Sequence, residues 1–483
     1  MFYLNTKEFL DNVCKEIKYK PANKTISDEL ESHIEEIKEE NICKGMSVEE
    51  AENNAVKQMG DAKKIGKKLN KIHKPKLDFI TLILAGIMII LGGGYYKLLY
   101  PTTKYMSLNG FINGRVEYII ILFTLLLSVF IYFWDYRKMK KYSNAFYIIA
   151  TILNIIAYFR GFRANGNLIY GLWPFVSISP AVITVPLYII AFAGFMSDIN
   201  KEEKIKIITQ NNQEINPNII KIAILSIISV IFSLMINFVS GFLVSSVYII
   251  MAIKEILKNK NIKYKISFII ISIVSFVMLA EMICIIPLKS HMEEDKIEPT
   301  SAYWVGVETK EEKAINFVRS EIFKSAKLIG KADLQDEYIE NEYGYIGDIS
   351  KYFDIKGNFA LLSIVSNYGW IAGFILIGLL LAFNVKLIIN AVKMKNKYGK
   401  MLVTGIACLY MIQTVYNLLM NFGIIETAEF NLPFISVGDV EWLVNILCVS
   451  LTLSVYRRRN INFEEPKKLN IVSKIESFIF EEC

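Results

Sequence analysis

Long apolar segments recur along this chain and constrain its fold more than any other feature. A helix of about 20 apolar residues can cross the hydrocarbon core of a bilayer. Such segments, the third of them short, cover residues 79–96, 117–134, 145–159, 177–196, 218–236, 239–257, 266–287, 359–385, 401–423 and 437–456. At 53% hydrophobic residues, the 483-residue chain is too apolar for an ordinary soluble protein. The sequence therefore predicts an all-α polytopic membrane protein of about ten transmembrane helices.

Basic residues gather in alternate connections between these segments, at 137–141, 254–265, 393–400 and 457–459. Cytoplasmic loops retain Lys and Arg because such loops resist translocation, so this pattern predicts that both termini are cytoplasmic. A further run of lysines at 63–76 is explained by positive-inside anchoring or by attraction to anionic membrane lipids. These anchors explain the formal net charge of +7, and we expect no nucleic-acid partner.

The polar residues 1–75 predict a separate cytoplasmic helical bundle. Its first long helix carries apolar residues on one face: Ile26, Leu30, Ile34 and Ile37. Ser47 and Glu50 form the pattern of a capping box at the start of the next helix. Gly60 is expected to end that helix, and Asp61 to cap the third.

This N-terminal segment resembles the permease-prefix domain that precedes several bacterial membrane proteins. The resemblance rests on the strings Asp28-Glu-Leu-Glu-Ser-His-Ile-Glu-Glu-Ile37, Gly45-Met-Ser-Val-Glu-Glu-Ala51 and Gln58-Met-Gly-Asp61. These motifs describe packing more than chemistry. A role in regulation or partner docking is the expectation that follows.

A polar face interrupts one of the last apolar segments. Gln413, Asn417 and Asn421 recur every four residues, which puts them on one side of a helix. Polar side chains within a membrane are costly unless they meet protein, water or a substrate head group. The face therefore predicts a functional site, followed closely by the segment Asn431-Leu-Pro-Phe-Ile-Ser436.

These residues resemble the SEDS family of shape, elongation, division and sporulation proteins (FtsW, RodA and SpoVE). Beyond the polar face, the matching positions are Gly423, Pro433, Phe434, Ile435, Ser436, Gly438 and Asn445. Asp135-Tyr-Arg137, Ser177-Ile-Ser-Pro180 and a polar outer segment at 288–358 follow the family in order and topology. The resemblance implies a transmembrane domain at 76–459, with a cytoplasmic tail at 460–483.

Membership would imply a peptidoglycan glycosyltransferase of the bacterial plasma membrane, acting on a lipid-linked precursor in division, shape or sporulation. A class B penicillin-binding protein is the usual partner. The chemistry needs a carboxylate to activate a sugar hydroxyl and cations to offset a diphosphate. We expect no cofactor and no metal site, because the three histidines are scattered. The resemblance places substrate-binding residues at Gln413, Asn417, Asn421, Ser436 and Asn445.

Several charges typical of the family are replaced in this chain. Alignment puts Asn358 where the family has its catalytic aspartate, and an amide cannot accept a proton. Asp354 is the alternative if the loop is shifted by one helical turn. Val182 and Val185 replace a Glu and Lys pair. Arg160 and Arg163 remain as residues that could bind a diphosphate, or as interfacial anchors.

Three functions remain open from the sequence. The first is an active but divergent SEDS polymerase, in which Asn358 or Asp354 takes the catalytic position. The second is a catalytically silent SEDS-like protein that binds a precursor or regulates a penicillin-binding protein. The third is a flippase for the lipid-linked precursor, for which a polar cavity would suffice, although no inverted repeat is evident.

Overall fold

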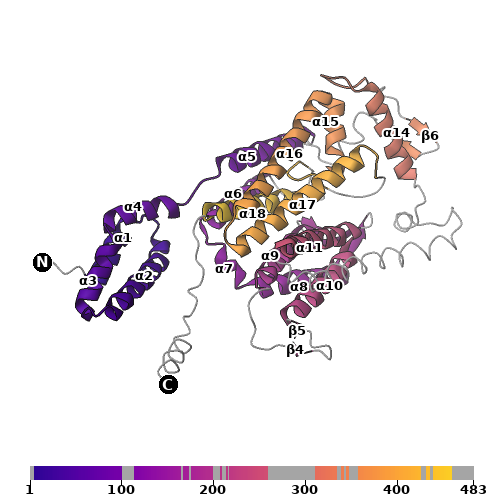
Figure 1. Ribbon diagram of the computed structural model, residues 1–483. Helices are drawn as coiled ribbons and strands as arrows, with labels where there is room; N and C mark the ends of the chain where they lie inside the picture. The colour runs from indigo at the N-terminus through magenta and orange to yellow at the C-terminus, as the bar shows by residue number, and fades with distance from the viewer. Residues whose placement is uncertain are drawn as a thin grey trace. The chain divides into compact units, whose positions relative to one another are not determined.

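The computed structural model of this protein consists mainly of helices (Figure 1). It describes residues 5–99, 114–164, 167–172, 176–198, 207–208, 214–215, 217–258, 310–333, 339–341, 344–346, 357–425, 431–435 and 439–459. The chain divides into two compact units. The first contains residues 1–77 with 394–396 and 456–483, and the second contains 78–393 with 397–455. The expected tail at 460–483 and much of the segment 288–358 lie outside the described residues.

The first unit begins with a bundle whose helix ends follow the capping signals of the sequence. Its elements are α1 (Thr6–Glu16), η1 (Lys20–Ala22), α2 (Asn23–Cys43), α3 (Val48–Met59) and α4 (Ala62–His73). Ser47 and Glu50 form the predicted capping box of α3. Gly60 follows α3 at φ +88°, and Asp61 accepts from the first amides of α4. The buried core includes Phe9, Val13, Ile17, Ile26 and Ile34.

The second unit is a helical assembly with short strands in its connections. The helices are α5 (Phe79–Leu99), α6 (Gly114–Phe133), α7 (Arg137–Lys140), α8 (Ser143–Arg160), α9 (Pro180–Asp198), α10 (Pro217–Ile236), α11 (Phe238–Lys258), α14 (Lys310–Ser325), α15 (Ala360–Tyr368), α16 (Trp370–Lys393), α17 (Lys397–Asn421) and α18 (Asp439–Arg457). The antiparallel strands are β1 (Phe162–Ala164), β2 (Asn167–Leu172) and β3 (Val176–Ile178), then β4 (Ile207–Ile208) with β5 (Glu214–Ile215), and β6 (Ile339–Asn341) with β7 (Gly344–Ile346). A 3-10 turn, η5 (Gly357–Phe359), precedes α15.

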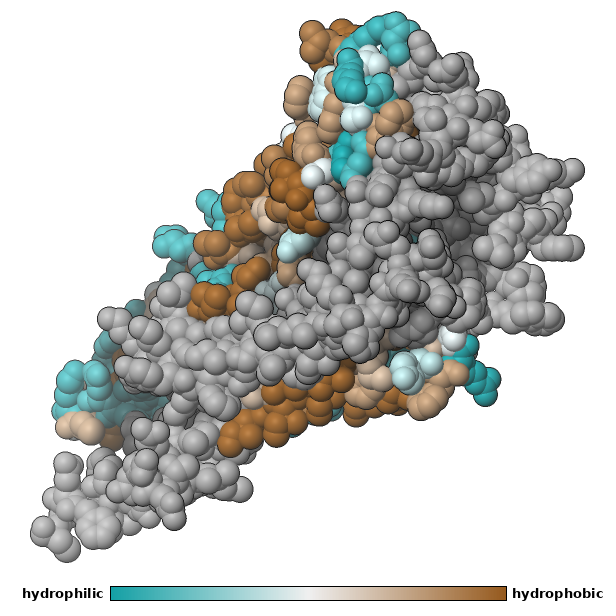
Figure 2. Space-filling model, turned by 90° about the vertical axis from the view of Figure 1, so that its right-hand side faces the viewer, coloured by the Kyte–Doolittle hydropathy of each residue, from teal (hydrophilic) through white to brown (hydrophobic). Residues whose placement is uncertain are grey.

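The second unit has the surface of a multi-pass membrane protein. Five of its described helices are long and apolar enough to cross a bilayer: α8, α9, α16, α17 and α18. Shorter apolar stretches lie in α5, α6, α10 and α11. Large apolar side chains are exposed on these helices, as Phe79, Phe123, Phe159 and Phe374 illustrate. Figure 2 shows stretches of hydrophobic surface in brown, with groups of hydrophilic residues in teal beside them. The predicted window 266–287 lies outside the described residues.

Helix α9 lies at the centre of this unit, in contact with α8, α10, α11 and α17. Its side chains are accordingly buried on most sides, including Tyr188, Phe192 and Met196. Phe192 stacks on Tyr248 of α11 with ring centroids 3.9 Å apart. A helix surrounded by others needs apolar residues around its whole circumference, and the sequence of α9 meets that requirement.

The apolar window 359–385, expected as one helix, is two helices joined at Gly369. This residue has φ +91°, a conformation that favours glycine. A Cβ there would lie 2.7 Å from the carbonyl oxygen of Leu328. The amide of Trp370 donates to the Lys327 carbonyl at 3.0 Å, and that of Ile371 to Leu328 at 3.1 Å. The segment after α14 therefore occupies the break and supplies the acceptors that a continuous helix would have provided.

A buried polar cluster joins the start of α5 to α16. Asp78 lies 3.1 Å from Lys386 Nζ, and the two side chains are only 3% and 12% exposed. Thr81 Oγ1 and Asn390 Nδ2 each donate to Asp78 Oδ2 at 2.5 Å. Burial alone would raise the pKa of Asp78, but the hydrogen bonds from Thr81, Asn390 and Lys386 outweigh it and lower the pKa. Asp78 is thus held in its charged form at neutral pH.

We predict that Asp78→Asn, Lys386→Met and the double variant will show coupled effects on stability. Asp78→Asn removes the carboxylate that faces the buried Lys386 charge, so it should cost about 3 kcal/mol of unfolding free energy. The double variant should cost less than the sum of the single changes, by at least about 1 kcal/mol. Unfolding in detergent measures each value, and additive effects would contradict the prediction.

Because the pKa of Asp78 is lowered, the stabilisation by the Asp78 cluster should be lost only as the pH falls below the ordinary value of 3.8.

Helix α5 also contacts the segment 431–435 through Gly92. A Cβ at Gly92 would lie 1.9 Å from the carbonyl oxygen of Phe434, closer than any real contact. Phe434 itself has φ +68°, in the left-handed region, where a residue other than glycine is strained. Its ring is buried against Phe383 and Tyr410 at centroid distances of 5.4 and 5.7 Å. Packing from both sides therefore holds this turn in its strained conformation.

The adjacent glycines of α5 provide a matched test of this contact. Gly92→Ala should destabilise the protein by about 1–3 kcal/mol, because backbone must move to admit the methyl group. Gly93→Ala should be neutral or stabilising by up to about 1 kcal/mol, because a Cβ there meets no atom within 4 Å and alanine favours the helix. Thermal unfolding in detergent compares the two. Equal effects would show that α5 does not press on the Phe434 turn.

Candidate functional site

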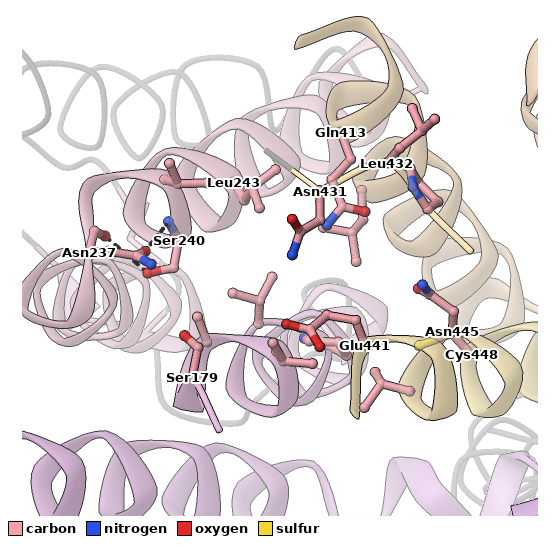
Figure 3. A pocket seen from close by; sticks show the side chains of 18 of the residues that line it. Ser179, Asn237, Ser240, Leu243, Gln413, Asn431, Leu432, Glu441, Asn445 and Cys448 are labelled. Atoms are coloured by element: carbon pink, nitrogen blue, oxygen red, sulfur yellow. Dashed lines mark hydrogen bonds between the residues drawn. The ribbon is translucent and has the colours of Figure 1, made fainter. Parts of the chain in front are cut away.

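A cavity of about 360 Å³ opens between α9, α11, α17 and α18 (Figure 3). Its wall on α9 is apolar and includes Val182, Val185 and Pro186. Pro186 lies inside the helix, where the ring removes one backbone hydrogen bond. The two valines are the residues that replace the expected charged pair. Both valines line the cavity, and their replacement of a charged pair stays a prediction from the family resemblance.

Amide side chains supply most of the polarity of this cavity. Gln413 comes from α17, Asn445 from α18 and Asn431 from the segment before the strained turn. Asn237 and Ser240 contribute from the start of α11, and the Ser240 amide donates to Asn237 Oδ1 at 2.8 Å. Figure 3 shows Gln413 and Asn431 on the side of the space opposite Glu441. Such a lining can donate to and accept from neutral hydroxyl groups.

Asn417 and Asn421 do not line the cavity; they bind the chain beside it. Both side chains are 0% exposed. Asn417 Nδ2 donates to the carbonyl oxygen of Asn358 at 2.8 Å, and Asn421 Nδ2 to the same oxygen at 3.3 Å. Asn421 Oδ1 in turn accepts from the amide of Leu362 at 3.3 Å. Two of the three residues of the predicted polar face therefore meet protein, and their amides fix the junction of η5 and α15.

This junction places Asn358 in the cavity lining. Its carbonyl is held by the two asparagines of α17, while its side chain is partly exposed. The position expected for a catalytic aspartate is thus beside the cavity, but it carries an amide. Asp354, the alternative position, lies outside the described residues.

Helix α14 contacts the same end of α17. Arg319 is 8% exposed, and its Nη1 donates to the carbonyl oxygen of Met420 at 2.9 Å. A Cβ at Gly423, where φ is +75°, would lie 2.6 Å from the guanidinium carbon. A cation at the C-terminus of a helix interacts favourably with the last carbonyls and with the helix dipole. Arg319 therefore stabilises the end of the helix that holds Asn358.

The other predicted binding residues are less closely tied to the cavity. Arg160 is exposed at the end of α8 and is not among the described residues of the lining. Arg163 lies in β1, but its side chain is outside the described part of the structure, as is the whole of Ser436. Their assignment as substrate-binding residues stays a prediction.

Sequence reasoning did not single out Asn237 and Ser240 as cavity residues. The available signal was local: an Asn three residues before a Ser, between two apolar runs, is a typical helix cap. That signal predicts a break between α10 and α11 but not which space the break faces. The space that the break faces is decided by packing against α17 and α18, which lie far along the sequence.

Comparison with known sequences identifies relatives of this chain. Residues 75–461 match the FtsW/RodA/SpoVE family, which is described as "Cell cycle protein". A probable peptidoglycan glycosyltransferase FtsW of Thioalkalivibrio sp. (strain K90mix) is 31% identical over 77 residues, covering 16% of this chain and 19% of that protein. A protein of the same name from Enterococcus hirae is 23% identical over 122 residues, covering 23% and 31%. The aligned parts thus span less than a third of these curated relatives.

Solved structures extend the similarity over most of the fold. One chain belongs to a peptidoglycan synthase complex studied for its coordination of polymerization and crosslinking. It matches 79% of this chain and 98% of its own length, with a TM-score of 0.56 and 15% identity. A mutant of the rod shape-determining protein RodA of Thermus thermophilus covers 79% and 98%, with a TM-score of 0.50 and 12% identity. From the match over residues 75–461 and this shared fold, the chain belongs to the FtsW/RodA/SpoVE family.

Proposed function

We propose that this protein is a cell-wall glycosyltransferase that polymerises a lipid-linked peptidoglycan precursor. The observation that carries the proposal is the cavity beside Asn358, enclosed by four helices of a family whose named relatives are probable peptidoglycan glycosyltransferases. The cavity lies in an assembly with an exposed apolar surface, where a lipid-linked substrate could enter from the bilayer. Division, shape and sporulation are all processes such an enzyme could serve.

The lining is suited to sugars. Gln413, Asn431 and Asn445 offer donors and acceptors, and the valines of α9 offer an apolar face. Neutral hydroxyl groups are recognised by such amides without the desolvation of a charge. Val182 and Val185 give this part of the cavity no fixed charge, so a diphosphate would have to find its cations elsewhere.

A class B penicillin-binding protein is the partner we propose, because one structural relative comes from a synthase complex that couples polymerization with crosslinking. We also propose that both termini face the cytoplasm. The basic loops at 137–141, 254–265, 393–400 and 457–459 support that orientation. In this arrangement, Asn358 and α14 belong to the outer side of the membrane, where cell-wall polymer accumulates.

A second candidate function is a catalytically silent protein that binds the precursor or a penicillin-binding protein. The replacement of three expected charges, by Asn358, Val182 and Val185, favours it. An amide cannot take a proton from an acceptor hydroxyl, so catalysis at position 358 would be absent. In a silent protein, Asn358→Asp alone should restore little activity, since the valines would remain.

Polymerisation by the purified protein distinguishes the two functions. The full-length chain is incubated with lipid-linked disaccharide, with and without a class B penicillin-binding protein, and polymer is resolved by gel electrophoresis. We expect wild type to form polymer, and Asp354→Asn tests the alternative catalytic position in parallel. Bound precursor without polymer, in wild type and in Asn358→Asp, would instead support the silent function.

Gln413→Leu should weaken precursor binding while leaving the fold intact. Loss of one hydrogen bond to a neutral sugar should raise the Kd by about three- to tenfold. Val415→Leu is the matched control, because Val415 lies two residues further along the same helix. Val415 is 40% exposed and is not part of the described lining. Titration of the detergent-solubilised protein with labelled precursor measures both. Equal affinities of the two variants would exclude Gln413 from substrate binding.

A further inference from the structure

One cavity residue differs chemically from all others in the described lining. In the described lining, Glu441 carries a carboxylate. The other polar side chains there carry amides, hydroxyls or, at Cys448, a thiol. An amide has no basic site at neutral pH, and a buried thiol or hydroxyl is a poor base without a partner. Within the described lining, a proton can therefore be accepted readily only at Glu441.

The helix α18 directs Glu441 into the cavity. Glu441, Asn445 and Cys448 follow one another at intervals of four and three residues, so they share one face of that helix. Figure 3 shows the Glu441 carboxylate turned toward the space that Gln413 and Asn431 border from the other side. Glu441 lies in the first turn of α18, where the helix dipole favours a negative charge.

We propose that Glu441 is the general base of this chain, in place of the aspartate that Asn358 replaces. The inference rests on the proposed glycosyltransferase function and assigns its acid-base chemistry to a different wall of the same cavity. Asn358 enters the cavity from η5 and Glu441 from α18, and both line the one space. A carboxylate on either wall can reach a sugar held between them.

In the reaction, the Glu441 carboxylate takes the proton of the acceptor sugar's hydroxyl group. The hydroxyl oxygen forms a bond to the anomeric carbon of the donor sugar. The bond from that carbon to the diphosphate oxygen breaks, and the diphosphate lipid leaves with the electron pair. Glu441 then gives its proton to water, so the protein returns to its starting state.

The other residues of the described lining support this role, because none of them carries a formal charge. Val182 and Val185 line the α9 wall and carry no charge. Gln413, Asn431 and Asn445 can hold the acceptor sugar by hydrogen bonds while leaving a hydroxyl for the carboxylate. The same carboxylate would repel a diphosphate, so the leaving group must lie away from the α18 wall.

Glu441→Gln tests the assignment with almost no change of shape. Full-length variants are assayed for polymerisation of lipid-linked disaccharide with a class B penicillin-binding protein present. Glu441→Gln should lower kcat by about 100-fold or more, with KM and precursor affinity changed little. Glu441→Asp should keep part of the activity, because the carboxylate is retained on a shorter side chain. Glu321→Gln, which alters only a surface ion pair with Lys324 in α14, is the control and should match wild type.

A pH profile separates a catalytic role from a structural one. Wild-type and Glu441→Asp rates should rise with pH through one ionisation, whereas the residual rate of Glu441→Gln should lose that rise. Active wild type with an equally active Glu441→Gln would overturn the inference but leave the proposed function standing. Loss of activity in Asp354→Asn alone would assign the base to Asp354 instead. If wild type forms no polymer with any partner, the function and this inference both fail.

Discussion

Backbone groups within a membrane protein must find partners inside the protein, and the candidate site is built around one solution to that requirement. At η5 the chain is not in a regular helix, so the Asn358 carbonyl needs donors from elsewhere. The buried amides of Asn417 and Asn421 provide them, and Asn421 also accepts from Leu362. These bonds hold an irregular segment against α17. The segment brings Asn358 to the edge of the cavity.

The cavity combines this backbone support with an uncommon balance of charge. Its α9 wall carries Val182 and Val185, its described polar groups are mainly amides, and its carboxylate comes from α18. In a low-dielectric space, a charge affects a bound ligand more strongly than it would in water. In the described lining, the carboxylate thus lies on the α18 wall, whereas Asn358 and the α9 valines carry no charge.

Local patterns in the sequence predicted the elements well, whereas long-range packing decided the site. Apolar periodicity indicated the spans, and Ser47 and Asp61 marked the helix starts of the N-terminal bundle. The break at Gly369 was missed because the segment after α14, distant in sequence, makes it favourable. The different placements of Gln413, in the cavity, and Asn417, against backbone, could not be predicted either. Both residues belong to the same four-residue repeat on one helix face. Only the neighbours on η5 distinguish their roles.

Helix α5 is fixed at two levels, by the Asp78 cluster near its start and by the contact of Gly92 with Phe434. These points are separated by roughly 21 Å along a helix with a rise of 1.5 Å per residue. A bilayer thicker or thinner than the apolar length of a helix favours a change of its tilt. Here such a change would press on Phe434, three residues from the cavity residue Asn431. We therefore expect the thickness of the surrounding lipid to influence the shape of the cavity.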